Sequence, residues 1–200
     1  MAVITMPDWV VPNSAVPRLR DFGTTLTPFL GGPEQRINRL GTRFALTLTL
    51  PPQPTRDKAL IIQSRLLRAR EDRLLMEWPQ PDLDIGNPGA PLVSAAVMSG
   101  TALPLKGLTP GYVLREGQMI SINHAGRRYM EMVAAEVTAS ASGTASVAIW
   151  PLLRTPLSIN DVVEIASPKI EGQVSPGEEL SWQISVDRMA AFTFTLSEGA

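Results

Sequence analysis

The fold is decided by two stretches of alternating side chains, FALTLTL at residues 44–50 and FTFTLS at residues 192–197. In both, large apolar residues alternate with small, mostly hydroxyl-bearing ones, which is the period of two of a strand with one buried face. A third alternating stretch, LSWQISVD at residues 180–187, precedes the second and is joined to it by a short turn. The shared pattern predicts that this C-terminal hairpin pairs with the 44–50 strand in one sheet.

The segments on either side of the first strand have different signals. Proline and glycine punctuate residues 1–34, which predicts an irregular arm with short extended pieces, such as Val16–Phe22, ordered by a partner chain. Pro51 and Pro52 predict that the strand ends at Leu50. One helix is predicted over Thr55–Arg70, with Thr55 as its N-cap and an apolar face.

From Leu92 onward, short apolar segments recur every eight to twelve residues between turns, which is typical of a small all-β barrel or sandwich. The predicted fold class is therefore mainly β, a sheet or sandwich domain with one helix that carries an inserted small β-barrel. The domain hypothesis assigns residues 1–91 and 171–200 to a discontinuous sheet domain and residues 92–170 to the barrel.

Composition excludes several classes of function. The chain has 18 Lys and Arg against 19 Asp and Glu, a net charge of −1, which disfavours general binding to nucleic acid or anionic membranes. It has no cysteine and one histidine, so disulfides, thiolate zinc sites, thiol nucleophiles and multi-histidine metal sites within one chain are excluded. No signal peptide, transmembrane segment or membrane anchor is predicted, and assembly in a cytoplasm is expected.

No catalytic, cofactor-binding or metal-binding residues are predicted. His124 lies in the sequence Asn-His-Ala-Gly, typical of a hairpin turn, and no G-x-S-x-G motif accompanies it. Asp82 and Asp84 alternate in a turn-rich segment without the glycine and closing glutamate of a calcium loop. We therefore expect that the protein is not an enzyme.

Three stretches carry a family resemblance: GGPEQRINRLGTRF at residues 31–44, GYVLREGQMIS with GRRY at 111–121 and 126–129, and GTASVAIWPLLR at 143–154. In this combination the chain resembles a bacteriophage distal tail protein. The motifs are strands and turns rather than catalytic signatures, and together they touch most of residues 9–167.

The resemblance implies a structural role in the virion. Such proteins form a hexameric ring at the tail tip, in which a domain related to the tail-tube protein surrounds a lumen. The ring joins the tail tube to the hub and tip proteins, its peripheral barrel faces outward toward fibres, and DNA passes through the lumen during ejection.

Within this hypothesis, residues fall into two candidate sets. The first set is predicted to contact neighbouring subunits: Trp9, Arg36, Arg39, Arg65 and Arg68. The second set is uncharged and polar and is predicted to face the lumen: Thr47, Thr49, Thr193 and Thr195. Two alternatives stay open, another tail-tip or neck component and a carbohydrate-binding module that uses Trp78, Trp150 or Tyr129 as a sugar platform.

Overall fold

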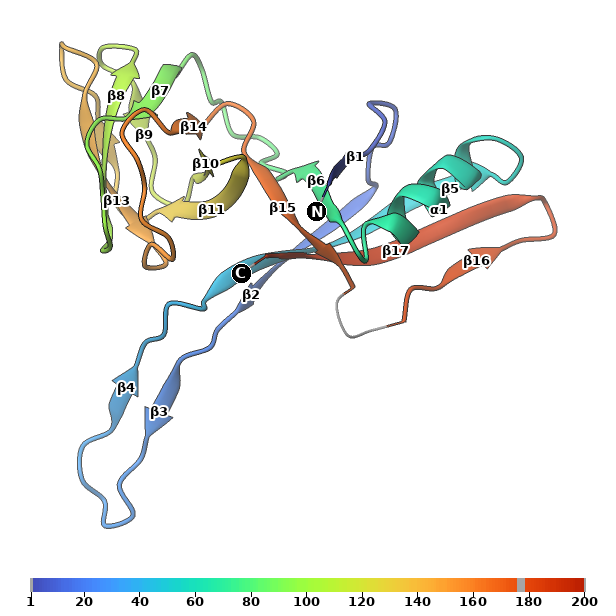
Figure 1. Cartoon of the computed structure of the whole chain (residues 1–200), viewed down its shortest axis with the longest axis horizontal. Coiled ribbons are helices and arrows are strands. Elements are labelled where there is room, and N and C mark those ends of the chain that lie inside the picture. Colours follow the sequence, from blue (N-terminus) through green and yellow to red (C-terminus); the bar gives the residue numbers. More distant parts are fainter. Residues whose placement is uncertain (1, 176–178, 200) are drawn as a thin grey trace.

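The computed structural model describes residues 2–175 and 179–199, and it confirms a mainly β chain with one α-helix and a closed barrel (Figure 1). The strands are β1 (Val3–Thr5), β2 (Ser14–Arg20), β3 (Thr24–Leu26), β4 (Gln35–Ile37), β5 (Arg43–Pro54), β6 (Arg73–Glu77), β7 (Gly89–Val93), β8 (Ala102–Leu108), β9 (Val113–Leu114), β10 (Met119–His124), β11 (Arg127–Val133), β12 (Val137–Thr138), β13 (Ala145–Trp150), β14 (Val162–Glu164), β15 (Lys169–Val174), β16 (Trp182–Ile184) and β17 (Met189–Glu198). The helix α1 spans Lys58–Arg68.

The large sheet joins the two ends of the chain. Its strand order is β1-β6-β15-β17-β5-β2. The short strand β16 pairs with β17 on the same edge as β15, farther toward the start of β17. The antiparallel β17–β5 pair places Phe192 opposite Leu50 and Thr193 opposite Thr49. This register confirms the predicted pairing of the C-terminal hairpin with the 44–50 strand. Since both strands alternate in the same way, their apolar side chains lie on one face of the sheet.

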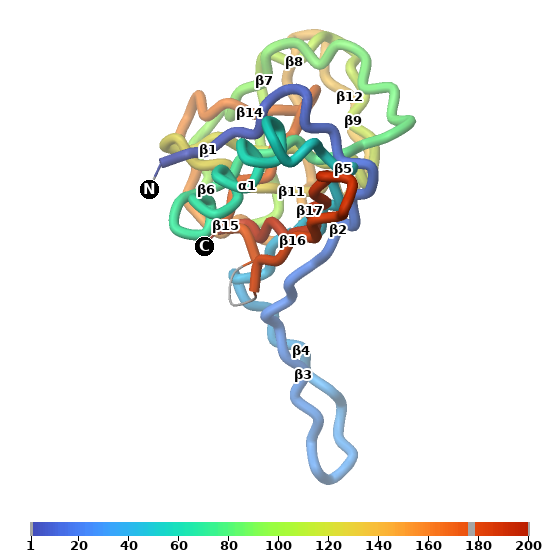
Figure 2. The backbone as a smooth tube through the Cα atoms, turned by 90° about the vertical axis from the view of Figure 1, so that its right-hand side faces the viewer, coloured from blue at the N-terminus to red at the C-terminus, as the bar shows by residue number. Residues whose placement is uncertain are grey.

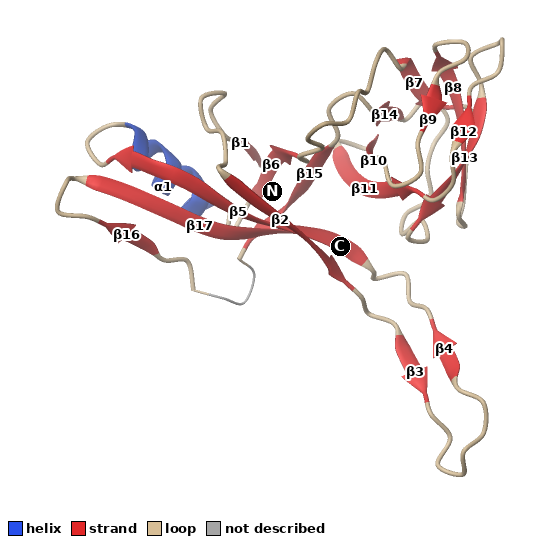
Figure 3. Ribbon diagram, turned by 180° about the vertical axis from the view of Figure 1, so that it is seen from behind, coloured by secondary structure: helices blue, strands red, loops and turns tan. Residues whose placement is uncertain are grey.

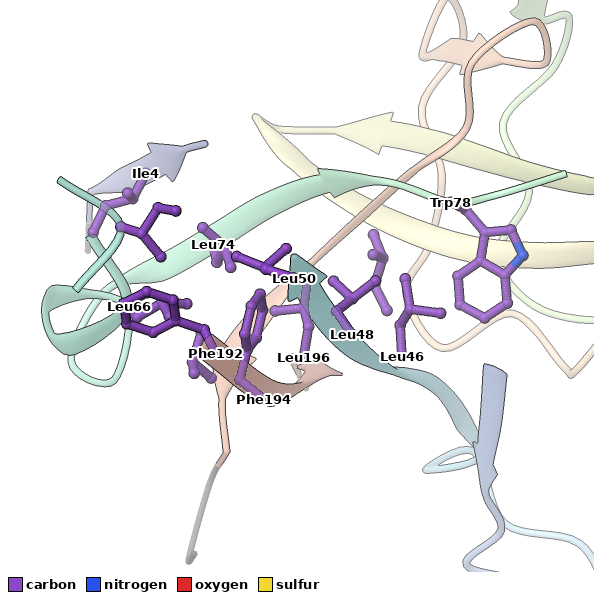
Figure 4. Close-up of a cluster of buried hydrophobic side chains, with 14 of the residues drawn as sticks. Ile4, Leu46, Leu48, Leu50, Leu66, Leu74, Trp78, Phe192, Phe194 and Leu196 are labelled. Atoms are coloured by element: carbon purple, nitrogen blue, oxygen red, sulfur yellow. The ribbon is translucent and has the colours of Figure 1, made fainter. Parts of the chain in front are cut away.

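The helix α1 covers that apolar face. Ala59, Ile62 and Leu66 are buried against the leucines of β5 and the phenylalanines of β17 (Figure 4). The opposite face of the sheet carries the threonines. One apolar layer between a helix and a twisted sheet thus forms the core of this part of the molecule.

Two predicted boundaries are wrong. The strand does not stop at Pro51, because β5 continues to Pro54 through a register shift opposite Ala190 and Phe192, and β2 pairs with β5 only as far as Thr49. Prolines are tolerated at such an irregular position beside an open edge. The helix begins at Lys58 with Asp57 as its N-cap rather than Thr55, whose N–H donates to the carbonyl of Arg188 in the β16–β17 hairpin.

The barrel closes in the strand order β10-β11-β13-β8-β7-β14, as the strand spacing predicts (Figure 3). It has its own apolar core, to which Leu103, Ile120, Val147 and Val163 contribute. The helix-covered sheet has a separate core. The following strand, β15, leaves the barrel and pairs with β6 and β17 of the large sheet.

A narrow arm leaves the sheet between β2 and β5. The arm, residues 21–42, contains the short β3–β4 hairpin and projects away from both the barrel and the helix (Figures 1 and 2). The proline-rich N-terminal segment is more ordered than its composition predicts, because β1 pairs in parallel with β6 and β2 pairs with β5. The predicted extended piece Val16–Phe22 lies against the sheet only as far as Arg20, and its last two residues belong to the arm.

Gly172 in β15 lies where the neighbouring strand β17 leaves no room for a side chain. A β-carbon at this glycine would overlap the carbonyl oxygen of Ser197 in β17. We expect Gly172→Ala to cost about 3 kcal/mol of unfolding free energy, since backbone atoms cannot move aside without loss of strand pairing. Urea unfolding followed by circular dichroism measures this cost.

The matched control is Gly32→Ala on the arm, where the new β-carbon meets only Pro28 at 3.4 Å. This variant should keep the wild-type unfolding midpoint. Equal stability of the two variants would contradict the described β15–β17 packing.

Candidate assembly surfaces

The arm carries an unusual density of exposed apolar side chains. Of the 21 exposed large hydrophobic residues that the described chain contains, six fall within the arm: Phe22, Leu26, Phe29, Leu30, Ile37 and Leu40. The arm tip, residues 27–33 (TPFLGGP), leaves Phe29 fully exposed and Leu30 93% exposed. A projecting, apolar element of this kind is typical of an interaction site.

The root of the arm is held by a carboxylate. Asp21 accepts hydrogen bonds from the N–H of Gly23 at 2.8 Å and from the hydroxyl of Thr42 at 3.1 Å, and it pairs with Arg36. These bonds, led by that from Gly23, hold the pKa of Asp21 below its usual value. Both strands of the arm are therefore tied together where they leave the sheet.

A half-open groove of about 780 Å³ lies beside β1 and β6 and extends to Ala15 of β2 and Leu48 of β5. Its walls are mainly apolar: Met6, Val10, Val11, Met76, Trp78 and Ile85. Asp8, Glu77 and Lys169 lie among the other lining residues. The side-chain amide Nε2 of Gln80, which also lines the groove, is buried without a hydrogen-bond partner in the described structure.

The four predicted lumen-facing threonines do come together on one face. Thr47 and Thr195 lie 3.0 Å apart through their hydroxyl oxygens, and Thr193 donates to Thr49 at 3.3 Å. These cross-strand pairs make a ladder on β5 and β17 that faces away from the apolar core. The hydroxyls carry no charge, so the centre of this face is polar and neutral.

The predicted subunit contacts are not one cluster. Arg36 and Arg39 lie on the exposed arm, whereas Arg65 and Arg68 lie in the last turns of α1. Trp9 is 38% exposed and lies under the ammonium of Lys58. Arg65 is engaged within the chain, donating to the carbonyl of Thr5 at 2.5 Å, while Arg68 is exposed.

The candidate sugar platform is disfavoured by burial. Trp78 is 7% exposed and packs edge-on against Phe44, and Tyr129 is 9% exposed beneath the guanidinium of Arg154. A sugar ring needs an open aromatic face, which neither provides. Trp150 is 39% exposed, but its ring also packs edge-on against Phe44.

The titratable residues considered for chemistry have structural roles. His124 lies at the end of β10, at the β10–β11 turn as predicted, and its Nδ1 is 2.7 Å from a carboxylate oxygen of Asp161, which ties that turn to the segment before β14. Asp82 and Asp84 lie in an exposed loop, where Asp84 accepts from the N–H of Gly86. Among the described residues, no group of three or more His, Cys, Asp or Glu side chains is placed to hold a metal ion.

Two glutamates of the large sheet fasten the barrel, a feature that the sequence does not indicate. Glu171 of β15 accepts from the N–H of Arg128, and Glu198 of β17 accepts from the N–H of Met130 at 2.8 Å. Both N–H groups belong to the part of β11 that is not paired with β13. Arg73 pairs with Glu171 and Arg154 with Glu198, so these buried carboxylates also have charged partners.

A third glutamate near this junction has no partner. Glu131 of β11 is fully buried, and neither of its carboxylate oxygens has a hydrogen-bond partner in the described structure. Burial raises its pKa from 4.5 to about 8, against the opposing effect of Arg154. The side chain is therefore mostly protonated at neutral pH.

No protein-family model matches this chain, and no curated protein matches it. No helix in the described residues is long and apolar enough to span a membrane. Sequence analysis missed Phe29 and Leu30, whose only signal is an apolar pair enclosed by Pro28, Gly31 and Gly32.

The pH dependence of stability tests the buried state of Glu131. Between pH 4.5 and about 8 the folded carboxyl keeps a proton that the unfolded chain has lost, so stability falls as pH rises through this range. We expect the stability of wild type relative to Glu131→Gln to fall by roughly 1 kcal/mol per pH unit there and to level off above it. Urea unfolding of both proteins from pH 5 to 9 measures the difference, and parallel profiles would show that Glu131 does not titrate in this way.

Proposed function

We propose that this chain is a structural subunit of the tail tip of a long-tailed bacteriophage. Six copies would form a ring that joins the tail tube to the hub and leaves a lumen for DNA. The proposal rests on the resemblance of the three sequence stretches together with the surfaces described above. It assigns the protein no enzymatic activity and no cofactor.

The observation that carries the proposal is the exposed apolar arm tip. Burial of a side chain such as Phe29 or Leu30 is worth about 1.5–3 kcal/mol, which a lone molecule forgoes. The arm tip lies well away from the hydrophobic core of the molecule, and hydrogen bonds to Asp21 hold the root of the arm (Figure 2). The tip is therefore suited to contact another molecule. Repetition of one such contact around a symmetric assembly gives a ring if the rotation closes.

The threonine ladder supports a role in the passage of DNA. A lumen that binds phosphates would slow a moving duplex, because each ionic contact adds affinity. Thr47, Thr49, Thr193 and Thr195 offer hydroxyls without charge, whereas toward the arm the same face continues into Arg18 and Arg20 on β2 and Arg43 on β5. We infer that the neutral part of the face lines the lumen.

The barrel is then peripheral. It is attached to the sheet beside the arm root, through Glu198, and projects from the end of the sheet away from α1 (Figure 1). In this arrangement the ring contacts the tail tube and the hub through its two rims, and the barrels face outward toward fibres or neighbouring tip proteins. The finished ring is located in the virion after assembly in the host cytoplasm.

Substitution of the arm tip tests self-association. We expect wild-type protein to form a discrete multiple of the 21.7 kDa chain, and the double variant Phe29→Ser, Leu30→Ser to be monomeric, because each contact loses its apolar anchors. Mass photometry and light scattering measure the masses. The control is Met98→Ser, which removes an exposed apolar side chain from the barrel side instead. Loss of assembly in that control alone, or assembly unaffected by the tip, would contradict the role of the arm.

Added charge on the threonine face tests the lumen assignment. Rings that carry Thr49→Lys and Thr193→Lys should retain duplex DNA in a salt-dependent manner, whereas wild-type rings should not. Electrophoretic retardation at several salt concentrations measures retention. The control, Ser140→Lys and Ser142→Lys on the barrel, adds the same charge elsewhere. Equal retention by both variants would exclude the threonine face as the DNA passage.

A further inference from the structure

The groove beside β1 and β6 is suited to an extended apolar segment. Its walls include Trp78 and the flexible thioethers of Met6 and Met76, which adapt to a range of side-chain shapes. Val11 on its border is 67% exposed. A groove of about 780 Å³ is large enough for several side chains, and most binding pockets of this size are apolar with few polar groups.

The wall of the groove contains a polar side chain, Gln80, with an unused hydrogen-bond donor. The oxygen of the Gln80 amide accepts from the N–H of Met119 at 2.7 Å, which fixes the amide plane. Its Nε2 is buried and has no hydrogen-bond partner within the described structure. A buried donor without an acceptor costs free energy, and a backbone carbonyl of an incoming chain would satisfy it.

The arm tip has the complementary chemistry. Residues 27–33 are uncharged and present Phe29 and Leu30 to solvent. The residues that follow include charges opposite to those beside the groove, since Glu34 can face Lys169 while Arg39 can face Asp8 or Glu77. The two surfaces therefore match in both polarity and charge.

The occupant must come from another molecule. The arm points away from β1 and β6, which border the groove, in both views of the molecule (Figures 1 and 2). We propose that the groove receives the arm tip of a second copy of this chain, an inference that rests on the proposed ring and names its connecting contact. Each copy has one tip and one groove at different places on its surface. The contact is therefore head-to-tail and can close into a ring.

The absence of cysteine from the chain allows a direct test by crosslinking. Leu30→Cys places a thiol on the tip and Val11→Cys places one on the groove border, both at exposed positions where the fold is not at risk. In the double variant, mild oxidation with copper–phenanthroline should link most of the chains into covalent multimers. Proximity should raise the crosslinked fraction at least ~10-fold above that of either single variant.

The matched control pairs Leu30→Cys with Met98→Cys, an exposed position on the barrel side. Assemblies that crosslink through the first pair but not through the control support the groove contact. Assemblies that form normally yet do not crosslink through Val11, or that crosslink equally through Met98, overturn the groove contact and leave the ring intact. Protein that stays monomeric at every concentration overturns both the groove contact and the proposed ring.

Discussion

The buried carboxylate of Glu198 fixes the three main parts of the molecule at one point. It accepts from Phe44 at the start of β5, where the arm rejoins the sheet, and from Met130 on the barrel strand β11. Burial raises the pKa of Glu198, while Arg154 and the two backbone N–H groups favour its charged form. Sheet, arm root and barrel are thus held in one relative position, and the proposed assembly needs that position to be constant.

The two faces of the large sheet, held in this fixed position, differ in what covers them. Helix α1 covers the apolar face of the sheet, so the threonine ladder is the face left without a cover. The arm and the groove lie at separate places on the molecule, and each leaves a deficit. Phe29 and Leu30 on the arm are apolar side chains exposed to water, and the Gln80 amide in the groove has a donor without an acceptor in the described structure. The proposed contact between copies would remove both deficits at once and would link the stability of a subunit to its assembly.

Sequence patterns predicted the features that depend on local periodicity. They predicted the pairing of residues 44–50 with 192–197 and the existence of the barrel. Both depend on alternation and on the spacing of turns, which are visible in residues close together in the sequence. The arm could not be recognised as a hairpin, since β3 and β4 pair through only three residues each. Burial of Glu131, Glu171 and Glu198 was equally hidden, because glutamate is usually exposed and only the tertiary contact between barrel and sheet encloses it.

Electron microscopy of the purified wild-type chain tests the central claim most directly. The account predicts closed rings of uniform size, with a central hole bordered by the sheet domains and with the barrels on the outside. Class averages that contain only single molecules, or head-to-tail chains that never close around a hole, would contradict it.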